Sequence, residues 1–445
     1  MRTLFQQQKT ALYHLEHNKQ FALFMEQGTC KTLPVLLHSL NLIKSGKIKN
    51  GLIVCPKAVR GGWENQINRF FFPLEQAMLY RTLTITTYDL IWRRPELDHD
   101  WDLIVLDESH HIKNRTSNRY SGQIKTITDP NTGKKKRVRV TRGIGQIARS
   151  AKYRYIMTGT PIGNSHWEEL WAQFDFLDPS IFGKYSEFEK RYCILNQFYK
   201  PWKYLHTDEL KEIMHAHSYR VKKTECLDLP EKLPPERFTL ELKEKSLYKE
   251  MLANYIADLD IEAKNPLARM MKLRQMCSGS ILDENGEIHR LKCEKPEILK
   301  DFIFNLEKKL VIFAEYKESI ADIKRVLTGK KISHVVLDGA QKDKSIWRRF
   351  QNEPELQVII CQYKTASAGI DLFASDTIIF YEPTLSSQIF EQACDRIHRP
   401  GQKEKCSYIL FETEKTVEVK IWDALMQHRD FNESEIWTYV NEERR

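Results

Sequence analysis

Five short motifs carry the residues that could do chemistry in this chain. In order, they are MEQGTCKT at 25–32, DESH at 107–110, MTGTP at 157–161, TASAGIDL at 365–372 and QACDRIHRPGQ at 392–402. Lysine, threonine and paired carboxylates are the residue types that hold a magnesium–triphosphate and orient water against it. One such motif could arise by chance, but five in this order indicate nucleotide hydrolysis.

The first motif has the composition of a phosphate-binding loop. Such a loop needs backbone N–H groups aimed at oxygen, one lysine and one hydroxyl that holds Mg2+. Lys31 and Thr32 follow Gly28, directly after the apolar run FALFM. The strict pattern GxxxxGK[ST] fails twice, because Met25 and Cys30 replace its glycines. We expect the loop to bind ATP, and we expect alkylation of the Cys30 thiol to inhibit turnover.

The second motif supplies two adjacent carboxylates. Asp107 and Glu108 end the apolar run WDLIVLD. At the end of a buried strand, Asp107 can hold Mg2+ through water, and Glu108 can orient or deprotonate the attacking water. The alternative is an ordinary helix cap, which would be the better explanation if the pair stood alone. Lys31 and the later motifs favour the catalytic interpretation.

Buried strands must position these motifs. Apolar, β-branched runs separated by helical patterns are typical of parallel sheets covered on both faces. In the first half these runs lie at 51–56, 82–89, 101–108 and 153–159, and in the second half at 309–316, 333–339, 356–362, 376–383 and 407–414. The fold class predicted is α/β, with two doubly wound, RecA-like lobes whose ligands collect beyond the carboxyl ends of the strands.

The predicted boundaries follow from composition. A chain of 445 residues is long for one core, so we expect lobe 1 at 1–227 and lobe 2 at 228–445. The proline-rich run DLPEKLPPERF predicts an extended linker at 228–242. A helical segment at 243–280 and the lobe 2 core at 292–445 follow it.

Two insertions are expected in lobe 1. An aromatic, helical protrusion is predicted at about 165–220. At about 123–143, two β-like runs flank the turn former DPNTG, which predicts a hairpin with one basic face. We expect this face to contact DNA, although a solvated loop would also explain its charge. The candidate DNA-binding residues of the hairpin are Lys134, Lys135, Lys136, Arg137 and Arg139.

Composition narrows the function classes. The net charge of +9 favours a polyanionic partner. No run approaches the length of a membrane span, and the nine cysteines include no CxxC pair. We therefore expect a cytoplasmic, monomeric protein without membrane, zinc or disulfides. The tryptophans at positions 63, 92, 101, 167, 171 and 202 could stack on bases, but most of them are expected to pack in the interior.

From Leu4 to about Trp422 the chain resembles superfamily-2 helicases, and among them the Swi/Snf-like DNA translocases. The segments that carry this resemblance are LFQQQKTALYHL (4–15), VCPKAVRGGWENQINRF (54–70), DESHHIKN (107–114), MTGTPIGNSHWEELW (157–171), MMKLRQMCSG (270–279) and DRIHRPGQ (395–402). The sequence EPTLSSQ departs from the family, which usually has DxxWNP there. The compact domain organisation is similar to that of a stand-alone phage or bacterial motor.

This resemblance implies roles for individual residues. Arg396 and Arg399 would be arginine fingers that complete the catalytic set of Lys31, Asp107 and Glu108, with Mg2+ held by Thr32 and Asp107. The implied ATP-binding residues are Gln8, Gly28, Thr29, Cys30, Lys31, Thr32, Gly369 and Asp371. The implied coupling residues are His110, Thr158, Thr160 and Gln392, and the further DNA contacts are Lys57 and Trp63.

The function expected is ATP-dependent translocation on duplex DNA, with remodelling of forks or Holliday junctions in replication, recombination or repair. The cofactors are ATP and Mg2+, and the partner is duplex or branched DNA, bound through its phosphates. Two alternatives stay open. One is a strand-separating helicase on tailed duplexes, and the other is an ATP-gated module that binds DNA or displaces proteins from it.

Overall fold

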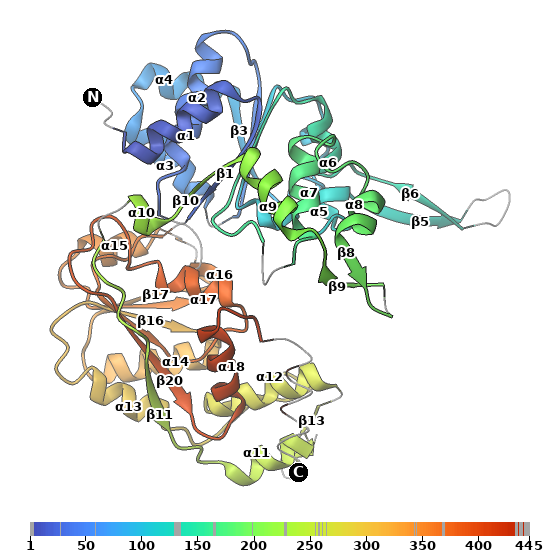
Figure 1. Ribbon diagram of the computed structural model, residues 1–445. Helices are drawn as coiled ribbons and strands as arrows, with labels where there is room; N and C mark the ends of the chain where they lie inside the picture. Colours follow the sequence, from blue (N-terminus) through green and yellow to red (C-terminus); the bar gives the residue numbers. More distant parts are fainter. Residues whose placement is uncertain are drawn as a thin grey trace. The chain divides into compact units, whose positions relative to one another are not determined.

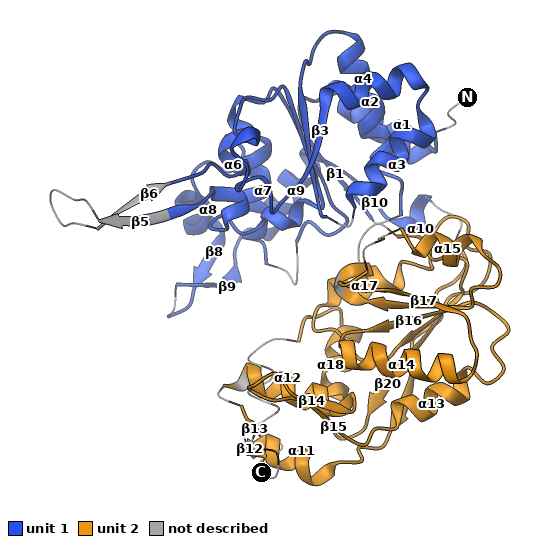
Figure 2. Ribbon diagram, turned by 180° about the vertical axis from the view of Figure 1, so that it is seen from behind, with its two compact units in different colours: residues 1–228 blue, residues 229–445 orange. Residues whose placement is uncertain are grey.

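The computed structural model describes residues 4–435 and 439, apart from 27, 58, 129–134, 163–165, 198, 227–228, 254, 257–258, 260, 264, 342, 344, 367–369 and 432–434. The chain forms two compact units, Met1–Asp228 and Leu229–Arg445 (Figure 2). Among the described helices, none is both long and apolar enough to cross a lipid bilayer.

Unit 1 is built on a six-stranded sheet in the order β10-β1-β7-β4-β2-β3, with every neighbouring pair parallel. Its strands are β1 (Gln20–Met25), β2 (Gly51–Cys55), β3 (Leu83–Thr87), β4 (Leu103–Asp107), β7 (Tyr153–Met157) and β10 (Ser218–Val221). Alternate residues of a strand serve opposite faces: in β4, Leu103 and Val105 join one core, and Ile104 and Leu106 the other.

Helices cover both faces of this sheet (Figure 1). The first core includes side chains of α1 (Gln6–His17), α2 (Thr32–Lys44), α3 (Arg60–Phe70) and α4 (Pro73–Thr82). The second core is covered by α6 (Ile144–Ile147) and α7 (Glu169–Leu177), with η1 (Pro95–Leu97), η2 (Ser109–Ile112), α5 (Asn118–Ser121) and η3 (Ala148–Ser150) beside them. The predicted doubly wound α/β lobe is confirmed.

The basic insertion forms the predicted hairpin. Strand β5 (Ile124–Thr128) pairs antiparallel with β6 (Lys135–Arg139), and Figure 1 shows the pair extending from the body of unit 1. Lys134 lies outside the described residues, as do the side chains of Lys135, Lys136, Arg137 and Arg139. The predicted DNA contacts of the hairpin therefore stay predictions.

The expected helical protrusion at 165–220 is more varied than its aromatic composition suggested. Helix α7 at its start is part of the core, and β10 at its end is an edge strand of the sheet. The middle contains α8 (Tyr185–Tyr192), the hairpin of β8 (Cys193–Leu195) and β9 (Pro201–Tyr204), and α9 (Thr207–Ala216), and of these α9 also packs on the core through Met214. The short helix α10 (Lys223–Cys226) ends the unit.

Unit 2 repeats the plan with a parallel sheet in the order β11-β20-β19-β16-β18-β17. Its strands are β11 (Glu236–Leu240), β16 (Leu310–Ala314), β17 (His334–Leu337), β18 (Val358–Gln362), β19 (Thr377–Phe380) and β20 (Ser407–Thr413). One face packs on α13 (Lys295–Phe302) and α14 (Lys317–Gly329), and the other on α15 (Trp347–Asn352), α16 (Tyr363–Ala366), α17 (Ser387–Cys394) and α18 (Val417–Met426).

Part of the predicted linker at 228–242 is a strand rather than a connection. Strand β11 pairs with β20 along its whole length. Phe238 packs its ring against Phe302 and Phe411, and Arg237 forms an ion pair with Glu412. These contacts fix a polar-looking segment at the edge of the sheet.

The predicted helical segment at 243–280 contains α11 (Lys245–Ala253) and α12 (Pro266–Cys277), separated by the short pair β12 (Tyr255–Ile256) and β13 (Ile261–Glu262). The hairpin β14 (Ser280–Leu282) with β15 (Ile288–Arg290) follows.

Candidate active site

The phosphate loop connects β1 to α2 in unit 1. Gly28 has φ +85° and Cys30 has φ +64°, both in the left-handed region. The Thr29 hydroxyl donates to the Glu26 carbonyl at 2.7 Å, which closes the turn. Lys31 then caps α2, and Thr32 is its first residue. The loop therefore ends at the N-terminus of a 13-residue helix, where free N–H groups and the helix dipole favour an anion.

Lys31 and Glu108 meet at the carboxyl edge of the sheet. Their Nζ and Oε1 atoms are 3.5 Å apart, and both side chains are about nine-tenths buried. The two residues are 77 positions apart in the sequence, but β1 and β4 each lie beside β7 in the sheet. The structure thus brings together the lysine and the carboxylate that the two motifs predicted as catalytic residues.

Asp107, the last residue of β4, is held by two aromatic side chains. The Trp63 indole N–H donates to its Oδ2 at 2.9 Å, and the Tyr88 hydroxyl donates to its backbone carbonyl at 2.9 Å. Burial, reinforced by the Glu108 charge, raises the pKa of Asp107 to about 6, although Lys31 and the indole N–H oppose this shift. These two hydrogen bonds fix the orientation of Asp107 at the end of β4.

Glu108 has the environment of a reactive carboxylate. Its backbone lies in the left-handed region, with φ +54°. Burial alone would raise its pKa, but the charges of Lys31, His110 and His111 lower the pKa below its ordinary value. Its Oε2 atom is buried and, among the described residues, accepts no hydrogen bond. A buried acceptor of this kind is costly unless a ligand, such as a water or a metal ion, completes it.

The residues of unit 1 that were predicted to couple hydrolysis to movement form a connected group. The His110 ring nitrogen Nδ1 lies 3.2 Å from the Thr158 hydroxyl and 3.5 Å from Glu108 Oε2. The Thr158 hydroxyl accepts the Thr160 backbone N–H at 3.1 Å. Burial lowers the pKa of His110, so the ring favours its neutral form. The Glu108 carboxylate is therefore connected to the residues that follow β7 through three contacts of 3.5, 3.2 and 3.1 Å.

Three residues near this site were missed by sequence reasoning. Gln173 of α7 accepts from the Ser109 hydroxyl at 2.7 Å and donates to the Pro161 carbonyl at 2.7 Å, which ties the second motif to the third. Lys223 is 5% exposed, and a methyl group added to Gly28 would lie 3.1 Å from its Cε atom. Tyr88 is the third. No short motif contains them, because each comes from a distant part of the chain.

Gln8 lies against the phosphate loop. It is 3% exposed, and its amide N–H donates to the Cys30 carbonyl at 3.0 Å. Its Oε1 atom accepts the Phe5 backbone N–H at 3.0 Å. The expected contact with adenine stays a prediction, while the structure adds a second role: Gln8 fixes the left-handed Cys30 peptide.

These residues fit a magnesium–triphosphate. The loop N–H groups and Lys31 match an anion, and Asp107, Thr32 and the unsatisfied oxygen of Glu108 offer the hard oxygen donors that Mg2+ prefers. Lys31 and Thr32 stand at the start of α2, and Asp107 and Glu108 stand at the end of β4. The arrangement can bind a nucleotide and present its terminal phosphate to a water beside Glu108.

The predicted arginine fingers occupy different environments in unit 2. Arg396 is 1% exposed, and it donates to the carbonyls of Gln392 at 2.8 Å and Ile370 at 3.3 Å. In this position Arg396 braces the segment around Ile370 within unit 2, and its role as an arginine finger stays a prediction. Arg399 forms an ion pair with Asp371 at 2.5 Å and is partly exposed, so its role stays a prediction. Gly369 lies outside the described residues.

Of the two remaining predicted DNA contacts, only one is accessible. Lys57 is exposed just after β2. Trp63 has no exposed surface. The expectation that Trp63 contacts DNA is therefore wrong for this structure: its ring packs in the core and its N–H group serves Asp107.

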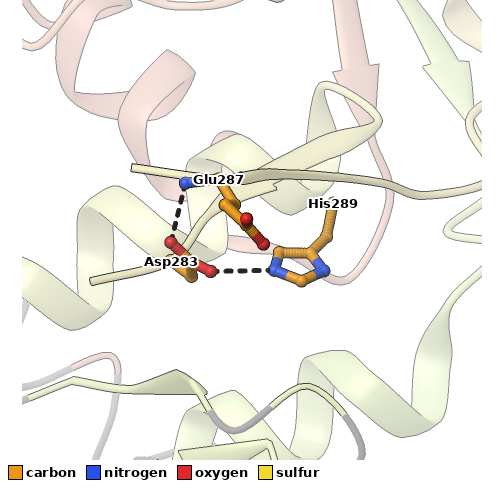
Figure 3. A group of neighbouring side chains, drawn as sticks. All are labelled: Asp283, Glu287 and His289. Atoms are coloured by element: carbon orange, nitrogen blue, oxygen red, sulfur yellow. Dashed lines mark hydrogen bonds and ion pairs between the residues drawn. The ribbon is translucent and has the colours of Figure 1, made fainter. Parts of the chain in front are cut away.

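Among the described residues, one group of three side chains could hold a metal ion elsewhere. Asp283, Glu287 and His289 lie in the β14–β15 hairpin (Figure 3). Asp283 accepts the backbone N–H groups of Asn285 and Glu287, and its Oδ2 lies 3.2 Å from the His289 ring. These bonds close the tight turn of the hairpin, which explains the cluster without a ligand.

Comparison with known families agrees with this geometry. The model of the SNF2-related domain matches residues 6–132 and 134–282, and the model of the helicase conserved C-terminal domain matches 294–401. The chain belongs to the SNF2-related family of superfamily-2 helicases. Both predictions, the two-lobed α/β fold and the Swi/Snf-like family, are confirmed.

Several curated relatives of this SNF2-related chain align over nearly its whole length. The uncharacterized ATP-dependent helicase MG018 of Mycoplasma genitalium is 24% identical over 94% of the chain and 40% of its own length. The homolog of the SWI/SNF-related regulator of chromatin subfamily A-like protein 1 of Caenorhabditis elegans is 24% identical over 94% of the chain and 60% of its own length. The chain thus spans about half the length of the relatives it matches.

A third relative is the ISWI chromatin-remodeling complex ATPase CHR17 of Arabidopsis thaliana, 24% identical over 89% of the chain and 39% of its own length. Among solved structures, the Sulfolobus solfataricus SWI2/SNF2 ATPase core in complex with dsDNA aligns over 100% of this chain and 96% of that chain. The identity is 21% and the TM-score 0.43.

Proposed function

We propose that this SNF2-related chain is an ATP-dependent DNA translocase that moves on duplex DNA and remodels branched DNA such as forks and Holliday junctions. The observation that carries the proposal is the buried Lys31–Glu108 contact beside the oriented Asp107 carboxylate. Membership of a helicase family and relatives named ATP-dependent helicase support the same reaction class.

The residues of unit 1 would act in sequence on Mg2+–ATP. The phosphate loop binds the β and γ phosphates. The ammonium group of Lys31 leaves Glu108 and contacts the phosphate instead. Glu108, released from that contact, accepts a proton from water or holds the water in line. When bound, Mg2+ supplies charge neutralisation of the phosphates, and Thr32 and Asp107 would hold it. His110 and Thr158 transmit the change at Glu108, and Arg399 and Arg396 are the candidates for fingers from unit 2.

DNA is the polyanion that the charge of the chain favours. The net charge is +9, Lys57 is exposed, and β6 carries the sequence KKRVR. Phosphate contacts carry no base sequence, so little sequence preference is expected. Release of counterions from ~5 phosphates gives a slope of about −4 to −5 in a plot of log affinity against log salt. An affinity independent of salt would argue against phosphate binding.

One assay tests the reaction. ATP hydrolysis is measured with and without blunt duplex DNA for the wild type, Lys31→Ala and Glu108→Gln. The proposal expects stimulation by duplex and roughly 100-fold or greater loss in both variants, of the size seen when a single catalytic contact is removed. Nucleotide binding without turnover in the wild type would instead support an ATP-gated binding module. Unwinding of a tailed duplex without stimulation by blunt duplex would support a strand-separating helicase.

The preference for branched DNA is tested through the basic hairpin. We expect a variant that lacks residues 127–140 to keep its ATPase activity on linear duplex and to lose branch migration of a four-way junction. Equal loss of both activities, or loss of neither, would reject this role for the β5–β6 hairpin.

A further inference from the structure

A second hairpin of unit 1, β8 with β9, exposes two large aromatic rings. We call residues 193–204 the aromatic hairpin. Tyr199 is 84% exposed and Trp202 is 69% exposed. Both views of the fold show β8 and β9 extending away from the body of unit 1 (Figures 1 and 2). Trp202 therefore does not pack in the interior, contrary to the expectation for most tryptophans.

The base of the aromatic hairpin is fixed. Cys193 belongs to a small buried cluster with Phe188, Tyr192 and Leu210, and the inward side chains Leu195 and Tyr204 pack against it. The Tyr204 hydroxyl also donates to the Glu168 carboxylate. The exposed rings thus stand on a rigid support rather than on a loose loop.

The tip is shaped by three hydrogen bonds of Asn196. Its carbonyl accepts the Tyr199 N–H at 3.0 Å, its side-chain oxygen accepts the Lys200 N–H at 3.1 Å, and its own N–H donates to the Lys200 carbonyl at 2.9 Å. Tyr199 has φ +55°, a conformation that is rare for an aromatic residue and that Gly or Asn adopts with less strain. A strained residue with an exposed ring points to a function outside the fold.

Within the sequence of the hairpin itself, the charged side chains have one sign. Lys200 and Lys203 are exposed, and the sequence 193–206 contains no Asp or Glu. Within the described part of the chain, neither lysine forms an ion pair, and neither Tyr199 nor Trp202 contacts another ring. Exposed aromatics interleaved with unpaired lysines match a single nucleic-acid strand, in which bases stack on rings and phosphates meet cations.

We propose that the aromatic hairpin binds unpaired DNA bases, which stack on Trp202 and Tyr199 while Lys200 and Lys203 contact the adjoining phosphates. The bases of an intact duplex are already stacked on each other, so these rings would distinguish opened DNA from closed duplex. This inference rests on the proposed function, because it names the DNA structure that the translocase would engage at a branch point.

The experiment compares full-length variants on two DNAs: a blunt duplex, and the same duplex with a ten-base mismatched bubble. The variants are Trp202→Ala, Tyr199→Gly (which suits the left-handed backbone), Trp202→Phe, and Phe72→Ala as a matched control. Phe72 is 71% exposed on the same unit but outside the hairpin. Thermal unfolding confirms that each variant is folded, and fluorescence anisotropy gives the dissociation constants.

The wild type is expected to bind the bubble more tightly than the blunt duplex. Trp202→Ala and Tyr199→Gly should each weaken bubble binding roughly 10-fold, the size of one lost base stack, and leave blunt-duplex binding and blunt-duplex ATPase stimulation unchanged. Trp202→Phe should keep most of the preference, and Phe72→Ala all of it.

Two results would overturn the inference. One is an unchanged bubble preference in Trp202→Ala, and the other is equal weakening on both DNAs. Failure of the proposed function looks different, because the wild type would then show no ATPase stimulation by blunt duplex, whatever the hairpin variants do.

Discussion

Replacing Trp63 by Phe tests whether the site depends on an oriented Asp107. The substitution keeps an aromatic ring in a fully buried position and removes one hydrogen bond of 2.9 Å to a carboxylate. A hydrogen bond to a charged group contributes about 1.5–3 kcal/mol. If Asp107 holds Mg2+, freeing its carboxylate should lower kcat/KM for ATP by roughly 10- to 100-fold. It should also raise the Mg2+ concentration needed for half-maximal rate.

Trp101 provides the matched control, because it is 4% exposed in the same unit and its indole N–H donates to the Leu97 carbonyl at 3.2 Å. Trp101→Phe removes the same ring volume and a neutral hydrogen bond, so it should destabilise unit 1 by about 0.5–1.5 kcal/mol plus the shared cavity cost. Steady-state ATPase kinetics at several Mg2+ concentrations separate the two effects. The reasoning is refuted if Trp63→Phe leaves the Mg2+ dependence unchanged, or if Trp101→Phe shifts it equally.

Three further outcomes follow from the structure. Lys295→Met should destabilise unit 2 by about 3–5 kcal/mol in denaturant titrations. The reason is that the Glu418 carboxylate, whose Oε1 lies 2.6 Å from the Lys295 Nζ, would stay buried without its counter-charge. Adding Glu418→Gln should recover much of the loss. Burial raises the pKa of Glu382 from 4.5 to about 7, so this carboxyl group holds its proton more tightly in the folded state than in the unfolded state. The stability is therefore fully present below pH 4.5 and is lost as the pH rises through 7. Relative to Glu382→Gln, the wild type should therefore lose roughly 3 kcal/mol of unfolding free energy between pH 4.5 and pH 8. Alkylation of Cys30 should inhibit ATP hydrolysis, and Cys30→Gly should abolish that sensitivity; undiminished activity after complete modification would contradict this.

Most of the two sheets could be predicted because their strands are buried on both faces. Runs such as LIVLD in β4 and LVIFA in β16 are almost entirely apolar, which distinguishes them from the amphipathic patterns of the neighbouring helices. The edge strands β10 and β11 were missed, because SYRV and ERFTL mix polar and apolar residues. Their assignment depends on partners far away in the sequence, and no local pattern contains that information. Strand β1 was not among the predicted strands either, although its run FALFM is apolar.

The site shows the same division between local and distant information. Lys31 and Glu108 were predictable because the chemistry requires their residue types at the ends of buried strands. The burial of Trp63 and Arg396 could not be predicted, because a motif gives the residue type and not its burial. Trp63 supports Asp107 from inside the core, and Arg396 binds backbone carbonyls within unit 2. In both cases the polar group is satisfied internally, as burial requires.

Cys30 takes the place of the last glycine of the phosphate-loop pattern, and its backbone still adopts the left-handed conformation. A non-glycine residue at φ +64° costs about 1–2 kcal/mol, a cost that can persist only where surrounding contacts hold the backbone. Gln8 supplies such a contact by donating to the Cys30 carbonyl, and its own oxygen is held by the Phe5 N–H. The segment before α1 and the phosphate loop are therefore coupled through one side chain. If the predicted contact of Gln8 with a nucleotide base forms, it would compete with the hydrogen bond that holds Cys30, and base binding would then be linked to the conformation of the loop.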